Sequence, residues 1–307
     1  MSVIVMTGGT SGFGATAAER MRSSDGVRLM LGARGAASGP EDTPDGESVP
    51  LDLASLDSVR GFAATVTTLL GETPIDALVL NAGLIRPTAT DRTVDGFETT
   101  FAVNHLAHYL LARLLLPSLA DQAIVVLTTS GTHDPATGSS LATPRHADAQ
   151  LLAYPDQDPE VDSRPRKAGE HAYTASKLCA VLTARSLSEP YNTHPRLLTA
   201  IAFCPGQVFG TGLARNLSRP LRTVWSLLGT PLGRPVRAVN RNFNTRAEAG
   251  NTLADLALGR ISPPDRHLYA TLRRGKLSWP DLAEMAQKEE LAQALWTDSA
   301  KLVGLPD

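Results

Sequence analysis

The sequence is poor in cysteine and has no long apolar segment. Its 307 residues include only two cysteines, Cys179 and Cys204, which is too few for a disulfide-stapled scaffold and suits a reducing compartment. No apolar run reaches the roughly 18 residues that a membrane-spanning helix needs. The opening stretch SVIVMTGG reaches its glycines too early for a secretory signal peptide. We therefore expect a cytoplasmic protein without a membrane span.

A surplus of charge of either sign is missing as well. The 29 lysines and arginines nearly balance the 31 aspartates and glutamates, which leaves a net charge of −2. Binding to nucleic acid usually relies on a basic surface, so we expect no nucleic acid as a partner. No group of histidine, cysteine and aspartate has the spacing of metal ligands, so we expect no metal site. The hydrophobic fraction of 42% is that of a globular protein with a sizeable core.

Short apolar runs alternate with segments of helical period. The runs predict strands at residues 3–7, 27–33, 47–53, 76–83, 123–129 and 197–206, and the periodic segments predict helices at 13–21, 57–70, 97–119 and 172–187. Continuous apolar strands between helices indicate a parallel sheet covered on both faces. We expect a doubly wound α/β domain of Rossmann type, which binds ligands at the carboxyl ends of its strands. No repeat or linker divides the chain, so residues 1–307 are expected to form a single domain.

Three segments lie outside that minimal sheet. Residues 131–171 contain five prolines and many polar residues, which predicts a surface insertion. Residues 211–245 mix apolar side chains with arginines, as in a small helical lid over a substrate pocket. Residues 262–307 form a C-terminal extension that ends in an amphipathic helix. The insertion lies between Ser130 and Tyr173, so we expect it beside the substrate.

The stretch TGGTSGFG follows the first predicted strand and opens the first predicted helix. Its glycines Gly8, Gly12 and Gly14 have a TGxxxGxG spacing. Small residues at such a turn let the backbone approach a pyrophosphate, and the helix N-terminus supplies N–H groups and partial positive charge. The alternative is a glycine-rich turn with no ligand, but its place in the α/β pattern favours a dinucleotide.

Two side chains near the next strand ends concern the choice of dinucleotide. Arg34 lies twenty positions after Gly14, in the stretch LGARG. An acidic residue there would bind the ribose 2′-hydroxyl of NAD, whereas an arginine suits the 2′-phosphate of NADP. An exposed loop arginine is the alternative. Asp52, after the third predicted strand, either accepts a hydrogen bond from the adenine amine or caps the following helix.

The stretch AYTASKLCA places Tyr173 and Lys177 four positions apart, on the same face of a helix. An ammonium group one turn from a phenol favours the phenolate and should lower the pKa of Tyr173 towards the range of a general acid or base. Ser130, at the end of its predicted strand, could hold a substrate oxygen. An exposed tyrosine–lysine pair is the alternative. His133 and Asp134 are interpreted as turn-forming or substrate-lining residues rather than as a further acid–base pair.

Taken together, these motifs resemble the short-chain dehydrogenase/reductase family over about residues 1–260. The resemblance is carried by the TGxxxGxG turn, NAG at 81–83, Asn104 in VNHLAHYLL, Ser130 in TTSG, Tyr173 and Lys177 in YTASK, and PGQVFGTG at 205–212. The stretches DLASLDSVR, SKLC, PGQVFGTGLARN and ALWTDSAKLVGL are similar to the branch of light-dependent protochlorophyllide reductases. The stretch SGTHDP is closer to the retinol-dehydrogenase-like relatives. Cys179 matches a cysteine of the photoenzymes, although a small buried apolar residue would explain it as well.

The resemblance implies a set of site residues and a cofactor, NADP(H). The implied catalytic residues are Asn104, Ser130, Tyr173 and Lys177, with Asn104 holding a relay water and Lys177 also binding the nicotinamide ribose. The implied cofactor-binding residues are Gly8, Thr10, Ser11, Gly12, Phe13, Gly14, Arg34, Asp52, Leu53, Asn81, Ala82, Gly83, Tyr173, Lys177, Pro205, Gly206, Val208 and Thr211. A small-molecule substrate is implied too, and the family leaves a homo-oligomer open.

We therefore expect an NADPH-dependent oxidoreductase that interconverts a carbonyl and an alcohol. The apolar residues Trp225, Leu227, Leu228 and Phe243 of the predicted lid favour a medium-to-large apolar substrate. Reduction of a C=C bond, including light-driven reduction of a tetrapyrrole, is a second hypothesis. A non-catalytic NADP sensor or scaffold is a third, and it ranks last because the chain keeps both the tyrosine and the lysine.

Overall fold

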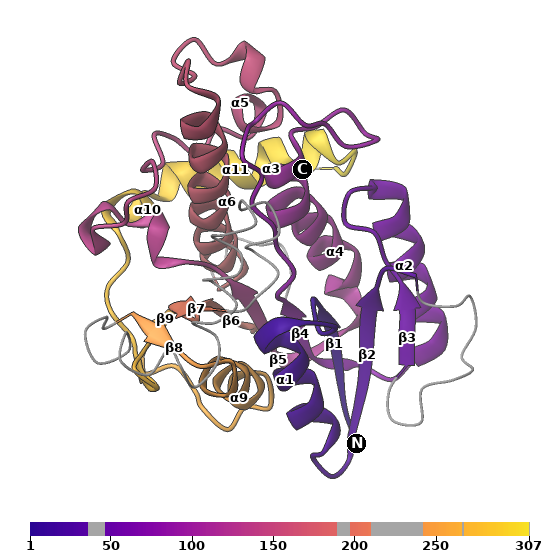
Figure 1. Ribbon diagram of the computed structural model, residues 1–307. Coiled ribbons are helices and arrows are strands. Elements are labelled where there is room, and N and C mark those ends of the chain that lie inside the picture. Colours follow the sequence, from indigo (N-terminus) through magenta and orange to yellow (C-terminus); the bar gives the residue numbers. More distant parts are fainter. Residues whose placement is uncertain (36–46, 189–196, 210–241, 266, 307) are drawn as a thin grey trace.

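The structure is a computed structural model, and it describes residues 1–35, 47–188, 197–209, 242–265 and 267–306. Its centre is an eight-stranded sheet of order β10-β9-β6-β5-β4-β1-β2-β3, in which only the β10–β9 pair is antiparallel (Figure 1). The strands are β1 (Ser2–Thr7), β2 (Val27–Ala33), β3 (Glu47–Pro50), β4 (Ile75–Leu80), β5 (Leu119–Thr128), β6 (Thr199–Cys204), β9 (Tyr269–Arg273) and β10 (Lys276–Ser278). A small separate sheet pairs β7 (Gln207–Val208) with β8 (Phe243–Asn244). The predicted α/β fold class is confirmed.

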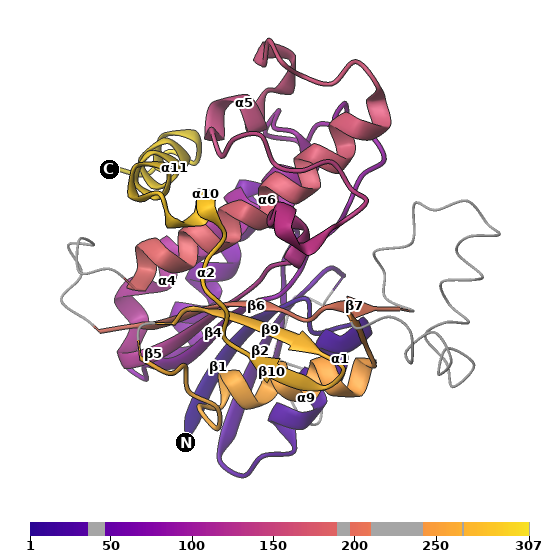
Figure 2. The same ribbon diagram turned by 90° about the vertical axis from the view of Figure 1, so that its left-hand side faces the viewer.

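Helices cover both faces of the large sheet. Figure 2 shows α1 and α9 on one side of it and α2, α4 and α6 on the other. The helices are α1 (Gly12–Arg22), α2 (Leu56–Leu70), α3 (Thr99–Phe101), α4 (Ala107–Leu115), α5 (Ala149–Ala153), α6 (Pro165–Ser188), α9 (Arg246–Ala257), α10 (Glu284–Gln287) and α11 (Glu289–Leu302). Each face has its own apolar core, centred on residues such as Phe62 and Tyr109 on the α2–α4–α6 side and Met21 and Phe203 on the α1–α9 side. This two-sided burial explains why the parallel strands have continuous apolar sequences.

The predicted long helix at 97–119 is interrupted. It consists of α3, a π-helical turn η1 (Ala102–Leu106), α4 and a 3-10 turn η2 (Leu116–Ser118). Pro117 has no N–H to continue the α-helix, and β5 starts at Leu119, four residues earlier than expected. The π turn contains Asn104, and such turns are frequent at functional sites because they change the direction of one side chain.

The insertion at residues 131–171 is ordered by buried carboxylates. It contains the 3-10 turns η3 (Gly131–His133), η4 (Pro135–Thr137) and η5 (Pro155–Gln157) besides α5, and α6 begins at Pro165 rather than at 172. The carboxylate of Glu170 accepts hydrogen bonds from Arg166 Nε (3.0 Å), Lys167 Nζ (2.7 Å) and the backbone N–H of Ala142 (3.1 Å). Asp158, also buried, is paired with Arg145. These contacts tie the insertion to the first turns of α6.

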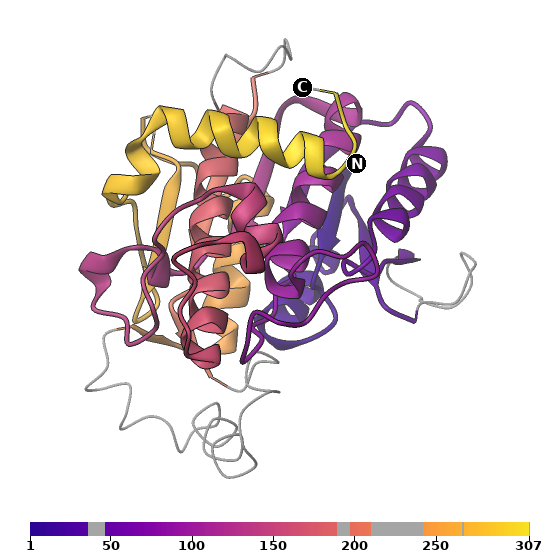
Figure 3. The ribbon, with the colours of Figure 1, turned by 90° about the horizontal axis from the view of Figure 1, so that it is seen from above.

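The C-terminal extension contributes to the core rather than trailing from it. Its first part supplies β9 and β10, which extend the sheet beyond β6. Its last part, α11, crosses the outer side of α6 and α4 (Figure 3). Tyr109 donates a hydrogen bond to the main-chain oxygen of Trp296 at 2.8 Å, and His105 bonds to Ser299 Oγ at 2.8 Å. The predicted terminal helix is thus present and docked. The lid expected at residues 211–245 lies mostly outside the described residues.

Three buried histidines predict an acid-sensitive fold. Burial lowers the pKa of His105 to about 3, and it lowers the pKa values of His108 and His171 to about 4. The unfolded chain binds these protons near pH 6.5, so the free energy of unfolding should fall as the pH drops from 6.5 to 4, by about 1.4 kcal/mol per pH unit for each histidine. Urea unfolding at a series of pH values measures this slope. His267→Gln, at an exposed histidine, should leave the slope unchanged, whereas a flat stability profile would contradict the prediction.

None of the helices within the described ranges is long and apolar enough to span a membrane. In the same residues, no three histidine, cysteine, aspartate or glutamate side chains gather as ligands for a metal ion.

Candidate active site

The carboxyl ends of β1, β4, β5 and β6 bring the predicted catalytic residues together. Ser130 follows β5, and its hydroxyl lies close enough to the phenol of Tyr173 from α6 to influence the pKa of that phenol. The ammonium of Lys177 lies 5.7 Å from the centroid of the Tyr173 ring. Lys177 Nζ and Asn104 Oδ1 each lie 3.3 Å from the position that a Cβ on Gly83 would take, so both border the NAG segment. The structure thus gathers the four side chains around one space beside the glycine turn.

The glycine turn has the shape that a pyrophosphate requires. Gly8 and Gly12 adopt left-handed backbone angles, with φ of +70° and +62°. A Cβ on Gly14 would stand 2.1 Å from the main-chain oxygen of Gly8, so the chain can only close this turn without a side chain there. Helix α1 starts at Gly12, and the side chain of Ser11 does not cap it. Its first N–H groups therefore remain suited to an anion, which fits a dinucleotide phosphate.

The pKa of Tyr173 differs from the prediction. Burial raises it to about 12, although the nearby hydroxyl of Ser130 acts in the opposite direction. The expected lowering by Lys177 fails for a geometric reason, because Lys177 Nζ donates to the main-chain oxygen of Thr128 at 3.1 Å rather than to the phenol. Tyr173 is thus a protonated group at neutral pH. It is in the state needed to donate a proton, not to accept one.

Lys177 is itself a perturbed group. Its side chain is buried, and burial lowers its pKa to about 8. The backbone around it is fixed, since Thr129 Oγ1 donates to the main-chain oxygen of Lys177 at 2.6 Å. A buried ammonium between β5 and α6 destabilises the fold, and groups whose pKa is perturbed in this way cluster at functional sites.

Asn104 is held by both ends of its amide. Its Oδ1 accepts from the backbone N–H of Leu84 at 2.8 Å, and its Nδ2 donates to the oxygen of Leu84 at 2.9 Å and to Ser176 Oγ at 3.0 Å. These bonds fix the π turn against the loop after β4 and against α6. Both N–H groups of the side-chain amide are thus used within the protein. The implied part of Asn104 in a water relay stays a prediction.

A buried histidine that the sequence analysis did not single out joins these parts. The hydroxyl of Thr7 accepts hydrogen bonds from the backbone N–H groups of Asn81 (3.0 Å) and Ala82 (3.2 Å). Both acceptor positions of that hydroxyl are then used, so its own proton goes to His108 Nε2, 2.9 Å away. His108 Nδ1 must therefore carry the ring proton, which it donates to the main-chain oxygen of Asn104 at 3.2 Å.

The neutral state of His108 agrees with its surroundings, because burial and the nearby charge of Lys177 lower its pKa to about 4. The sequence does hold a signal for it: in VNHLAHYLL, His108 follows Asn104 by four positions and shares its helix face. Its other partner, Thr7, is 101 positions away and could be found only in the fold.

The remaining predicted cofactor residues line the same edge, with some exceptions. Gly206 has φ of +70° beside Pro205, and Val208 is buried in β7. Thr10, Ser11 and Arg34 are exposed, Phe13 and Leu53 are partly buried, and Thr211 lies outside the described residues.

Asp52 does not cap α2, whose N-cap is Ser55. The Oδ1 atom of Asp52 accepts a hydrogen bond instead from the backbone N–H of Ala54 at 3.0 Å. A cavity of about 310 Å³ runs from Asp52 to Arg86 and Thr99.

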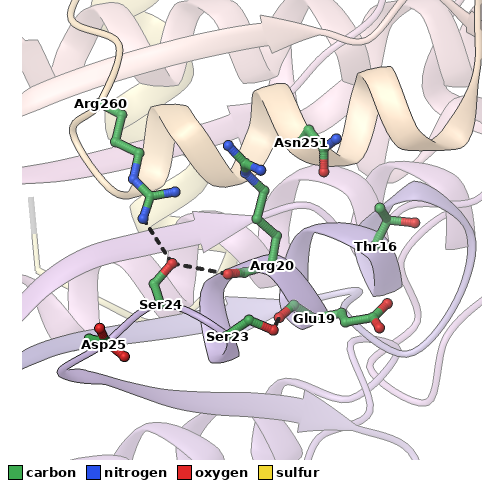
Figure 4. A pocket seen from close by; sticks show the side chains of 8 residues that line it. All are labelled: Thr16, Glu19, Arg20, Ser23, Ser24, Asp25, Asn251 and Arg260. Carbon is green, nitrogen blue, oxygen red and sulfur yellow. Dashed lines mark hydrogen bonds between the residues drawn. The ribbon is translucent and has the colours of Figure 1, made fainter.

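Two other features lie away from this edge. Cys179 is packed in the core, where burial raises the pKa of its thiol. This position agrees with the interpretation of Cys179 as a small buried apolar residue. A cavity of about 550 Å³ lies along α1 and α9, lined by Arg20, Ser24 and Arg260 among others (Figure 4). It opens near the C-terminal end of α1, whereas the glycine turn lies at the N-terminal end of that helix.

Comparison with known proteins agrees with this arrangement. The family model of the short chain dehydrogenases matches residues 2–140. Protochlorophyllide reductase from Avena sativa is 30% identical over 99% of this chain and 100% of its own length. The chloroplastic protochlorophyllide reductase B from Oryza sativa subsp. japonica is 32% identical over 99% of this chain and 77% of its own. The crystal structure of an uncharacterized protein from Mycobacterium paratuberculosis matches with a TM-score of 0.61 at 25% identity, over 99% of this chain and 94% of that one.

A Rossmann-type sheet with a serine, a tyrosine and a lysine at its carboxyl edge defines a dinucleotide-dependent oxidoreductase. The chain belongs to the short-chain dehydrogenase/reductase family.

Proposed function

We propose that this protein is an NADPH-dependent oxidoreductase that interconverts a carbonyl and an alcohol on a medium-to-large apolar substrate. The observation that carries the proposal is the meeting of Ser130, Tyr173 and Lys177 beside the glycine turn. The glycine turn and the N-terminus of α1 would hold the pyrophosphate, and the space next to Gly83 and Lys177 would hold the nicotinamide ribose. The bound cofactor supplies the hydride; the protein supplies the proton and the geometry.

The residues act on the carbonyl oxygen. Ser130 donates a hydrogen bond to that oxygen and holds it beside the phenol of Tyr173. Charge develops on the oxygen as the carbon is reduced, and Tyr173 gives up its proton to it. The ammonium of Lys177 stabilises the phenolate that remains. Because burial keeps Tyr173 protonated, the resting site is set for reduction; oxidation of an alcohol first requires removal of that proton.

Reduction of a C=C bond is the second candidate, and the similarity to protochlorophyllide reductases over nearly the whole chain favours it. A non-catalytic NADP sensor stays the weakest candidate, because the chain keeps both Tyr173 and Lys177 and both side chains are buried. The cytoplasmic location and any homo-oligomer remain predictions, as does the division into one domain with an insertion, a lid and an extension.

The experiment that separates the candidates is an assay of NADPH oxidation by the purified protein. A panel of aldehydes and ketones of increasing size is compared with protochlorophyllide, each in darkness and in light. Turnover of the carbonyl panel in darkness supports the proposal. Turnover of protochlorophyllide alone, in light, would replace it with the second candidate, and tight NADPH binding without any turnover would favour the third.

The choice of NADP over NAD is tested at Arg34. Its side chain is exposed beside the end of β2, where it can reach a 2′-phosphate. Arg34→Ala should raise the Kd of NADPH about 10-fold, since one charge-assisted contact is lost, and should leave the Kd of NADH unchanged. Fluorescence titration measures both constants. Arg22→Ala, at an exposed arginine at the end of α1, serves as the control. Equal effects of Arg34→Ala on the two cofactors would contradict the assignment.

A further inference from the structure

Arg273 places a guanidinium beside the catalytic serine. It is the last residue of β9, and its side chain crosses the end of β6. Nη1 donates to the main-chain oxygen of Leu272 at 3.0 Å and contacts the sulfur of Cys204 at 3.6 Å. Nη2 lies 3.1 Å from the position that a Cβ on Gly131 would take, and Gly131 directly follows Ser130. The charged end of the side chain therefore borders the turn that carries Ser130.

The Nε and Nη2 edge of this guanidinium is not used by the described residues. Nε and Nη2 of an arginine form the edge that binds both oxygens of one carboxylate. Arg20 uses that edge on Asp255, and Arg28 uses it on Glu47, with distances of 2.7 to 3.1 Å. Among the residues that the structure describes, neither Nε nor Nη2 of Arg273 has a hydrogen-bond partner, and no carboxylate pairs with it.

A nearby acidic residue does not supply the missing partner. Asp134, in the turn after Ser130, is not within ion-pair distance of Arg273, and its Oδ1 accepts from the backbone N–H of Ala136 at 2.9 Å. Arg273 itself is only partly exposed. A charge that is partly removed from water without a counter-ion is unfavourable for the fold, and such groups are retained where an anionic ligand binds.

Cys204 connects Arg273 to the reacting groups. Its sulfur accepts a hydrogen bond from the backbone N–H of Gly131 at 3.0 Å and touches the guanidinium on the other side. The same sulfur is close enough to act electrostatically on both Tyr173 and Lys177. One side chain thus separates the guanidinium from the catalytic pair, so one substrate molecule could contact both.

We infer that Arg273 selects carbonyl substrates that carry a carboxylate. The inference rests on the proposed function and makes the substrate more specific: an apolar body with an acid group, whose two oxygens bind the Nε and Nη2 edge. This contact would fix the far end of the molecule while Ser130 and Tyr173 hold its carbonyl oxygen. Arg273 is therefore a specificity-determining residue, and no proton or hydride passes through it.

The test compares two substrates that differ only in charge, para-formylbenzoate and its methyl ester. In the wild type, kcat/KM should be higher for the acid than for the ester. Arg273→Met should lower kcat/KM for the acid about 10- to 100-fold and leave that for the ester within about 2-fold, because only the charge-assisted contact is lost. Arg273→Lys keeps the charge without the two-pronged edge and should recover part of the loss. Arg274→Met, at the exposed neighbouring arginine, should change neither value.

A binding measurement without turnover completes the test. Titration calorimetry of benzoate against the protein with NADP⁺ should give a Kd in the wild type and a Kd about 10- to 100-fold weaker in Arg273→Met. Equal benzoate binding in both proteins, or no benzoate binding by the wild type, would overturn the inference. Failure of the proposed function is a separate result: neither aldehyde would then be reduced, while the benzoate titration would still decide the role of Arg273.

Discussion

Tyr173→Phe is expected to lower kcat by about 10²- to 10⁴-fold, the usual contribution of a positioned general acid. The ring of Tyr173 is buried, so phenylalanine keeps the packing of α6 against the site and removes only the hydroxyl. NADPH should still bind, because the glycine turn and Lys177 are untouched. Steady-state kinetics for kcat and fluorescence titration for the cofactor measure the two quantities independently.

A matched variant separates this effect from the loss of any phenol. Tyr154→Phe removes a hydroxyl from the insertion, where the ring packs against Phe97 at a centroid distance of 5.7 Å. That variant should keep kcat within about 2-fold of the wild type, as expected for a site away from the chemistry. Full activity of Tyr173→Phe would show that the proton comes from another group, and the mechanism given above would be wrong.

Lys177→Met is expected to abolish turnover and to make the fold more stable. The pKa of Lys177 is about 8 in the fold against an ordinary value of 10.5, which corresponds to a cost of about 3 kcal/mol for keeping the ammonium buried. Methionine fills similar space without a charge. The variant loses the hydrogen bond from Nζ to the oxygen of Thr128, worth about 1 kcal/mol or more. A net gain of about 1–2 kcal/mol in the free energy of unfolding at pH 7 remains.

The pH dependence of this gain has a definite sign. The folded protein holds the proton of Lys177 less tightly than the unfolded chain does, so between pH 8 and pH 10.5 the unfolded state binds more protons. Wild-type stability from this group therefore rises with pH over that window. The advantage of Lys177→Met should be largest below pH 8, should disappear within this window, and should be reversed by pH 10.5, where only the lost hydrogen bond to Thr128 counts.

Urea unfolding of both proteins across this range measures the difference. Lys301→Met, at an exposed lysine of α11, should change the stability by no more than about 0.5 kcal/mol at any pH. If Lys177→Met is less stable than the wild type at pH 7, burial of the ammonium of Lys177 does not lower the free energy of unfolding as proposed. Unchanged turnover in that variant would remove it from the mechanism.

The sequence predicted the parts of this molecule that depend on local pattern. The strands from β1 to β6 and the glycine turn could be located because apolar runs and glycine spacing are properties of short segments. The pairing of Tyr173 with Lys177 followed from helix spacing, whereas their meeting with Ser130 was implied by the resemblance to the family. The resemblance to a family added Asn104, whose role no spacing rule would have indicated.

The errors arose where a property depends on distant contacts. The pKa of Tyr173 is set by burial and by where Lys177 Nζ points, and neither can be derived from a spacing of four residues. The π turn at Asn104 requires the loop after β4 to hold that side chain. β9 was missed because its short run YATLR lies next to a second arginine and a glycine, in a stretch interpreted as an extension. Arg273 was missed with it, since its position is meaningful only once β9 lies beside β6.

The central claim is that hydride and proton are added across a carbonyl at the site of Ser130 and Tyr173. The most direct test uses NADPH deuterated at the carbon that donates the hydride, incubated with the wild type and the carbonyl panel, followed by mass and NMR analysis of the products. We predict deuterium on the carbinol carbon of the alcohol product, formed by the wild type and formed about 10²- to 10⁴-fold more slowly by Tyr173→Phe. Deuterium on a carbon of a former C=C bond, or an alcohol product of Tyr173→Phe at the wild-type rate, would contradict the account.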